Sequence, residues 1–64
     1  MDRQRELLSV NARINVLQSK IEGLERNNSE YAVKFGTYSE TINRKIRELA
    51  NEQERLLTER RALG

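Results

Sequence analysis

The chain lacks cysteine, histidine, proline and tryptophan, and it has only three glycines among its 64 residues. Without cysteine it cannot form a disulfide, and without cysteine or histidine it lacks the usual ligands of a structural zinc site. The same absences remove the commonest general base and the strongest nucleophile of enzyme active sites. We therefore expect no catalytic, cofactor-binding or metal-binding residues, and we predict that the protein is not an enzyme.

Long apolar stretches are missing as well. No apolar run approaches the ~18–20 residues that a helix needs to cross a bilayer. The first six residues, Met1 to Glu6, are mostly charged, and no apolar stretch of the kind found in signal peptides follows them. We therefore expect a protein that is cytoplasmic, or part of a larger particle, and that is neither secreted nor inserted in a membrane.

The composition also limits how stable a single copy can be. Hydrophobic residues make up 36% of the chain and charged residues 34%, against roughly 45–50% and about 25% in ordinary globular domains. A core of this size rarely contributes more than ~3–5 kcal/mol without a disulfide, a metal or a partner. Because the first two are closed to this chain, its composition favours association with another chain.

The large apolar residues recur at alternating steps of three and four, which is the heptad pattern of a coiled coil. A first seam covers residues 3–38 and comprises Leu7, Val10, Ile14, Leu17, Ile21, Leu24, Asn28, Tyr31, Phe35 and Tyr38. The core positions continue with Ile42, Ile46, Leu49, Gln53, Leu56, Arg60 and Leu63. The second seam, over residues 46–63, is weaker because two of its core positions are polar.

The two seams are joined by an irregular unit over residues 35–46. This unit spans eleven residues instead of a multiple of seven, which corresponds to a four-residue insertion in a heptad coil. Eleven residues over three turns slightly exceed the period of the helix itself, so a left-handed supercoil would unwind locally there.

These patterns predict an all-α protein in which residues 1–64 form a single coiled-coil segment. We expect one long helix per chain, from about residue 3 to residue 62, paired with a second copy as a parallel homodimer. The seam residues would then form the oligomer interface. Asn28 occupies a core position of the type that selects register by pairing with its own copy.

Two other architectures remain open from the sequence. Gly36 precedes Thr37, which with Glu40 matches the spacing of a helix capping box. One helix could therefore end and another begin near residues 35–37, which would give an antiparallel helical hairpin. Leu57, directly beside Leu56, could instead widen the seam into a three- or four-helix bundle.

One segment stands out as a possible partner contact. All three aromatic residues fall within eight positions, and a basic cluster follows them. The residues concerned are Tyr31, Phe35, Gly36, Tyr38, Arg44, Lys45 and Arg47. The aromatics could be bulky core residues, or they could form an opened segment that another protein occupies. The basic residues are interleaved with glutamates, which is typical of a solvated helix face.

The sequence thus favours a structural function: a coiled coil that acts as a dimerisation element, spacer or adaptor in a larger assembly. An alternative is a small helical regulatory or inhibitory protein that binds a larger protein. A third, less favoured hypothesis is weak non-specific binding of nucleic acid through the basic C-terminal half, which would depend strongly on salt. The expected partners are a second copy of the chain and another protein, with no cofactor and no membrane.

Overall fold

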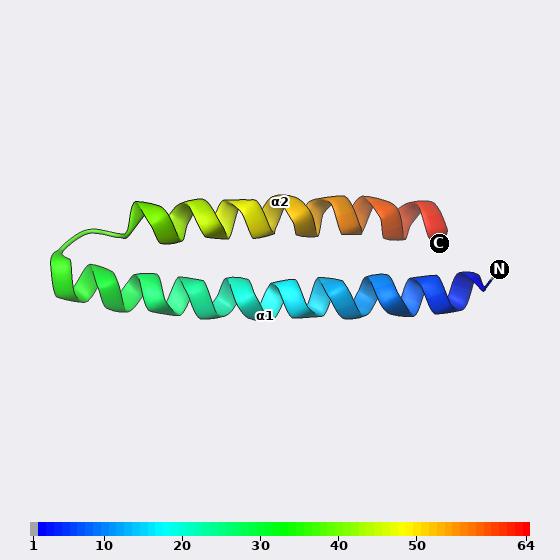
Figure 1. The fold of residues 1–64 in the computed structure, drawn as a ribbon, viewed down its shortest axis with the longest axis horizontal. Coiled ribbons are helices and arrows are strands. Elements are labelled where there is room, and N and C mark those ends of the chain that lie inside the picture. The colour runs from blue at the N-terminus through cyan, green and yellow to red at the C-terminus, as the bar shows by residue number, and fades with distance from the viewer. Residues whose placement is uncertain (1) are drawn as a thin grey trace.

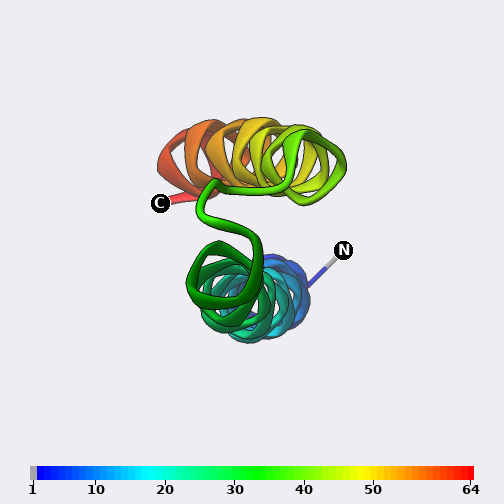
Figure 2. The same cartoon turned by 90° about the vertical axis from the view of Figure 1, so that its left-hand side faces the viewer.

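The computed structural model describes residues 2–64, so Met1, the first residue of the predicted segment, lies outside them. The described residues form two α-helices, α1 (Arg3–Phe35) and α2 (Glu40–Leu63), and contain no strand. The two helices run antiparallel and lie side by side, as two views at right angles show (Figures 1 and 2). The result is a rod of 51 × 14 × 12 Å, with both termini at one end and the turn at the other.

Side-chain caps explain where the two helices begin. Asp2 caps α1, because its carboxylate accepts hydrogen bonds from the backbone N–H groups of Gln4 (3.1 Å) and Arg5 (3.3 Å). Ser39 caps α2, because its hydroxyl oxygen accepts a hydrogen bond from the N–H of Ile42 (3.3 Å). Such caps satisfy N–H groups that have no partner inside the helix.

Glycines mark where the helices end. Gly36 has a φ of 76°, in the left-handed region, and its N–H donates to the carbonyl of Ala32 (2.8 Å). Glycine enters this region without the steric cost that other residues incur. Gly64 follows the last residue of α2, and its N–H donates to the carbonyl of Arg60 (2.9 Å).

The observed hairpin differs from the single long helix predicted for residues 3–62. Residues 36–39 are not helical, and the chain folds back through them. The alternative prediction, a helical hairpin with its turn near residues 35–37, is therefore confirmed. The proposed capping box was wrong in detail, since Ser39 rather than Thr37 caps α2 and Glu40 is its first residue. The turn lies inside the eleven-residue unit, so the phase shift of the seam reflects the reversal of the chain.

The core between the helices is narrow. Four apolar side chains are buried among the described residues: Val10, Ile14, Ile21 and Leu56. Most other large apolar residues of the seam are only half-buried, because a second helix covers one side of each and leaves the flanks open. The hairpin therefore has apolar surface along its seam that a third or fourth helix would cover.

The cap on α2 should contribute measurably to stability. Ser39→Ala is expected to lower the free energy of unfolding by about 1 kcal/mol, because the N–H of Ile42 loses its partner. Urea denaturation followed by circular dichroism measures this change. Ser9→Ala, at an exposed position inside α1, is the matched control and should not destabilise the protein. Equal stability of the two variants would show that Ser39 does not cap the helix.

Candidate functional site

Three side-chain hydrogen bonds cross from one helix to the other and fix their register. They join Asn28 to Asn43 (2.8 Å), Gln53 to Gln18 (2.9 Å) and Arg60 to Asn11 (3.1 Å). Ten residues along α1 separate the first pair from the second, and ten residues separate them along α2. Seven residues on each helix separate the second pair from the third. The helices are thus held in one antiparallel register, and we call the flank with these bonds the polar flank.

Asn28 is the buried member of this flank and belongs to the pair nearest the turn. Its side chain is 3% exposed, its amide nitrogen donates to the Asn43 carbonyl oxygen (2.8 Å), and its own carbonyl oxygen accepts from the backbone N–H of Ser39 (2.7 Å). Because both ends of the amide are satisfied, its burial carries no penalty for an unpaired polar group. The sequence predicted that Asn28 would pair with its own copy, whereas in the structure it ties α1 to the turn and to α2 of the same chain.

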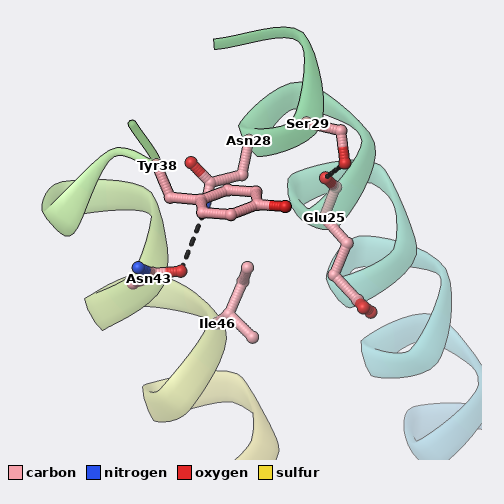
Figure 3. Close-up of a pocket in the computed structure, with 6 residues that line it drawn as sticks. All are labelled: Glu25, Asn28, Ser29, Tyr38, Asn43 and Ile46. Carbon is pink, nitrogen blue, oxygen red and sulfur yellow. Dashed lines mark hydrogen bonds between the residues drawn. The ribbon is translucent and has the colours of Figure 1, made fainter. Parts of the chain in front are cut away.

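An open hollow of about 360 Å³ lies next to this pair. Glu25 and Ser29 of α1, Ile46 of α2 and Tyr38 of the turn line it together with Asn28 and Asn43 (Figure 3). Tyr38 reaches from the turn into the space between the helices. The hollow is lined by both polar and apolar groups, and Glu25 is its one charged side chain. It therefore lacks the several charged groups that would bind an ionic ligand.

The opposite flank of the seam is apolar. The helical period separates its α1 residues from those of the polar flank, and three hollows of about 220, 450 and 330 Å³ follow one another along it. We call this surface the leucine groove; its apolar lining comprises Val16, Leu17, Leu24, Ile42, Leu49 and Leu56. Its charged rim comprises Arg13, Lys20, Arg44, Lys45, Glu48 and Glu52. Such a groove has the form that receives the apolar face of another helix.

Two ion pairs lie along this rim. Arg13 and Glu52 are 4.0 Å apart across the groove, and Lys45 and Glu48 are 3.9 Å apart on α2. All four side chains are substantially exposed, so each pair contributes only about 0–1 kcal/mol. The rim charges therefore contribute little to the stability of the hairpin.

The aromatic residues gather at the tip of the rod. The rings of Tyr31 and Phe35 are 4.5 Å apart between centroids and tilted by 40°. Phe35 is 62% exposed and Tyr38 59%. The last turn of α1 extends beyond the start of α2 (Figure 1), so this end of α1 has no helix beside it. Tyr31 and Phe35 line a hollow on the side of the leucine groove, whereas Tyr38 lines the hollow beside Asn28 on the polar flank. We call these three residues near the turn the aromatic tip.

The structure separates the predicted partner-contact residues into two groups. Tyr31, Phe35, Gly36 and Tyr38 all lie at the tip, whereas Arg44, Lys45 and Arg47 lie on the first turns of α2. Arg44 and Lys45 border the leucine groove. Since the three basic residues are exposed and one of them pairs with Glu48, they do not form a concentrated positive patch.

The residues predicted as an oligomer interface lie along the seam of a single chain. Those buried there are Val10, Ile14, Ile21, Asn28 and Leu56. Those half-buried are Leu7, Leu17, Leu24, Ile42, Ile46, Leu49, Gln53 and Leu63. Those exposed are Tyr31, Phe35, Tyr38 and Arg60. The seam is thus occupied by the second helix of the same chain, while the exposed aromatic members remain without a covering element.

Sequence reasoning missed three residues of the polar flank, Asn11, Gln18 and Asn43. Each lies one position beyond a seam residue, so the heptad pattern assigns it to its margin. Their partners lie 49, 35 and fifteen positions away in the sequence. The pairing becomes visible only once the antiparallel register is known.

Other kinds of site are not found in the described part of the chain. No group of three or more acidic side chains among residues 2–64 could hold a metal ion, and neither α1 nor α2 is long and apolar enough to span a bilayer. No protein-family model matches the chain, and no curated protein or solved structure matches it either. The polar flank, the leucine groove and the aromatic tip are therefore the features from which a function is inferred.

The Asn28 interactions predict a specific loss of stability. Asn28→Leu should lower the free energy of unfolding by about 1–3 kcal/mol, because the part-buried N–H of Ser39 and amide of Asn43 lose their partner. Asn27→Leu, at the exposed neighbouring position, is the control and should change it by no more than about 0.5 kcal/mol. Denaturation at low protein concentration measures both. A stabilised Asn28→Leu variant, as an Asn paired with its own copy in a coiled coil would give, would contradict the role assigned here.

Proposed function

We propose that the hairpin is a structural self-association module in which two copies stack through their leucine grooves as a four-helix bundle. The bundle would serve as a dimerisation element or spacer within a larger assembly. The proposal rests mainly on the difference between the two flanks of the seam. One flank is joined by hydrogen bonds between the helices, whereas the other is crossed by one weak ion pair and leaves a row of half-buried leucines along a groove.

Incomplete burial supports this proposal. Leu17, Leu24 and Leu49 are only half-buried in the single hairpin. Covering apolar surface contributes about 25 cal/mol per Å², and a chain of this length without disulfide or metal usually depends on a partner for stability. A second hairpin laid on the groove would cover these residues together and would leave the polar flank facing solvent.

The rim charges favour one way of stacking two copies. On α1 the rim carries Arg13 and Lys20, and on α2 it carries Glu48 and Glu52 together with two basic residues. If the two-fold axis lies parallel to the helices, α1 of one copy covers α2 of the other. Lys20 then comes level with Glu48 and Glu52 of the second copy. Stacking α1 on α1 would bring the basic residues of the two copies together instead, which costs free energy.

A second candidate function is docking on a larger protein, as a regulatory hairpin would do. It is favoured by the tilted contact between the exposed rings of Tyr31 and Phe35. The hollow between these rings and α2 is lined by Ile42, which also lines the leucine groove. An amphipathic helix of another protein could therefore extend from the groove onto the aromatic tip. The two functions differ in whether the isolated chain associates with itself.

Sedimentation velocity over a wide concentration range tests self-association. We expect a compact dimer that forms with increasing concentration, and at least about tenfold weaker association for Val16→Asp, because two carboxylates would enter the covered groove. Val16 is 53% exposed, so the hairpin itself should tolerate the change.

Val33→Asp is the matched control, because Val33 is 89% exposed and lies outside the groove lining. It should associate like the unaltered chain. An unaltered chain that stays monomeric at every concentration would contradict self-association. Docking on another protein would then become the leading function.

A further inference from the structure

The aromatic tip is an unusual end for a helical hairpin. Helix turns are ordinarily built from small and polar residues that face solvent. Here Tyr38 lies in the turn, Phe35 ends α1 and Tyr31 lies one helical turn earlier, and Phe35 and Tyr38 expose more than half of their surface. Aromatic side chains contribute most when they are covered, so the exposure of these rings indicates a second arrangement in which another helix covers them.

The heptad spacing shows which arrangement would do so. Tyr31, Phe35, Tyr38 and Ile42 follow one another at steps of four, three and four, the spacing of one helical stripe. In the hairpin this stripe is interrupted because residues 36–39 form the turn. If those residues were helical, the stripe would continue from the seam of α1 into the seam of α2. Phe35 and Tyr38 are thus seam residues that have no helix level with them in the hairpin, whereas Tyr31 lies level with the start of α2.

We propose that the hairpin opens at residues 36–39 and exchanges helices with a second copy, giving an antiparallel swapped dimer. In this dimer α1 of each chain packs on α2 of the other, through the contacts seen within the hairpin. The aromatic tips of the two copies meet at the centre and cover each other. The partner is therefore another copy of this chain, and the interaction surface is the aromatic tip.

The register of the hairpin supports this geometry. Asn28 faces Asn43 in the hairpin, and in the swapped dimer the same pair forms between chains. Seven residues further toward the turn on each helix, position 35 of one chain comes level with position 36 of the other. The two copies of Phe35 therefore lie next to the two-fold axis, with Tyr31 and Tyr38 on either side. The three interhelical hydrogen bonds remain in place in both forms.

The turn itself sets the balance between the two forms. Its closed form depends on the left-handed conformation of Gly36 and on the hydrogen bond from the Ser39 N–H to Asn28 (2.7 Å). Opening gives up this hydrogen bond and turns residues 36–39 into helix. Glycine disfavours that change, because it is a poor helix former and is at ease in the left-handed region. Short hinge loops of this kind are where helix exchange occurs in other proteins.

The swapped dimer is distinct from the groove-to-groove dimer proposed above and does not rest on it. Exchange of helices leaves the leucine groove uncovered, whereas groove stacking leaves each hairpin closed. The two forms have the same mass but differ in the distance between α1 and α2 within one chain. A short distance in the dimer would contradict helix exchange but not groove stacking. A long distance would contradict groove stacking of closed hairpins but not helix exchange.

Paired spin labels on Ser19→Cys/Asn51→Cys give this distance, since the chain has no other cysteine and both positions are exposed. Labelled chains are diluted into an excess of unlabelled chains, so that only distances within one chain are seen. The closed hairpin should give about 20–30 Å, as expected for neighbouring helices with labels pointing outward. An opened chain should give about 48 Å, the length of 32 helical residues.

Gly36→Ala should shift the balance toward the open form. An added Cβ meets no atom within 4 Å at either Gly36 or Gly23, so the two positions differ only in conformation. At Gly36 alanine opposes the left-handed turn and favours helix, which we expect to change the equilibrium by about tenfold per hinge. With two hinges per dimer, the dissociation constant of the swapped dimer should fall by about a hundredfold. Gly23→Ala, inside α1, should leave it unchanged.

A third variant tests the aromatic contact. Phe35→Asp in the Gly36→Ala background should abolish the long distance and restore a monomer, because two carboxylates would face each other at the two-fold axis. Val33→Asp in the same background is its control and should keep the open dimer. The proposal is overturned if Gly36→Ala remains closed at millimolar concentration, or if it dimerises while the distance within each chain stays short. It is also overturned if Phe35→Asp leaves the open dimer intact.

Discussion

Two packed helices share a single line of contact, and this constraint governs the other features of the hairpin. Only side chains at the centre of the line, such as Val10, Ile14 and Leu56, are shielded from both sides. Side chains next to the line are covered by the facing helix on one side only. Their other side faces solvent. The chain does this differently on its two flanks, with amide and guanidinium hydrogen bonds on one and half-buried leucines on the other. The functional proposal follows from that difference.

The heptad spacing predicted helical structure and identified the side chains that line the seam, because the period of an α-helix determines which residues share a face. It did not determine whether the facing helix comes from the same chain or from another, since both arrangements bury the same stripe. The choice depends on a few local interactions. Gly36 takes a left-handed conformation, and Asn28 binds Ser39 and Asn43 at separations of eleven and fifteen residues. Such long-range pairings are invisible to a reading of local periodicity.

The surface features were predicted less completely than the seam. The sequence showed that the aromatics are close together, but their exposure follows from the unequal ends of the two helices. It also placed Arg44, Lys45 and Arg47 in one candidate site with them, although the first turns of α2 carry these residues away from the tip. The leucine groove was not predicted, because it becomes a surface only when two segments distant in the sequence are brought together. Leu57 had indicated a widened seam, and in the structure it packs against the buried cluster.

Both termini lie at the same end of the rod, opposite the turn (Figure 1). A pulling force applied through the two ends would therefore act across the helix pair and not along it. The interhelical contacts would be loaded one after another, beginning at Arg60 and Asn11 and reaching Asn28 and Asn43 last. Contacts loaded in sequence yield at lower force than contacts loaded together. Pulled by its two ends, the closed hairpin would therefore unzip at low force. The opened antiparallel dimer, pulled along its long axis, would load all interhelical contacts together and would separate only at higher force.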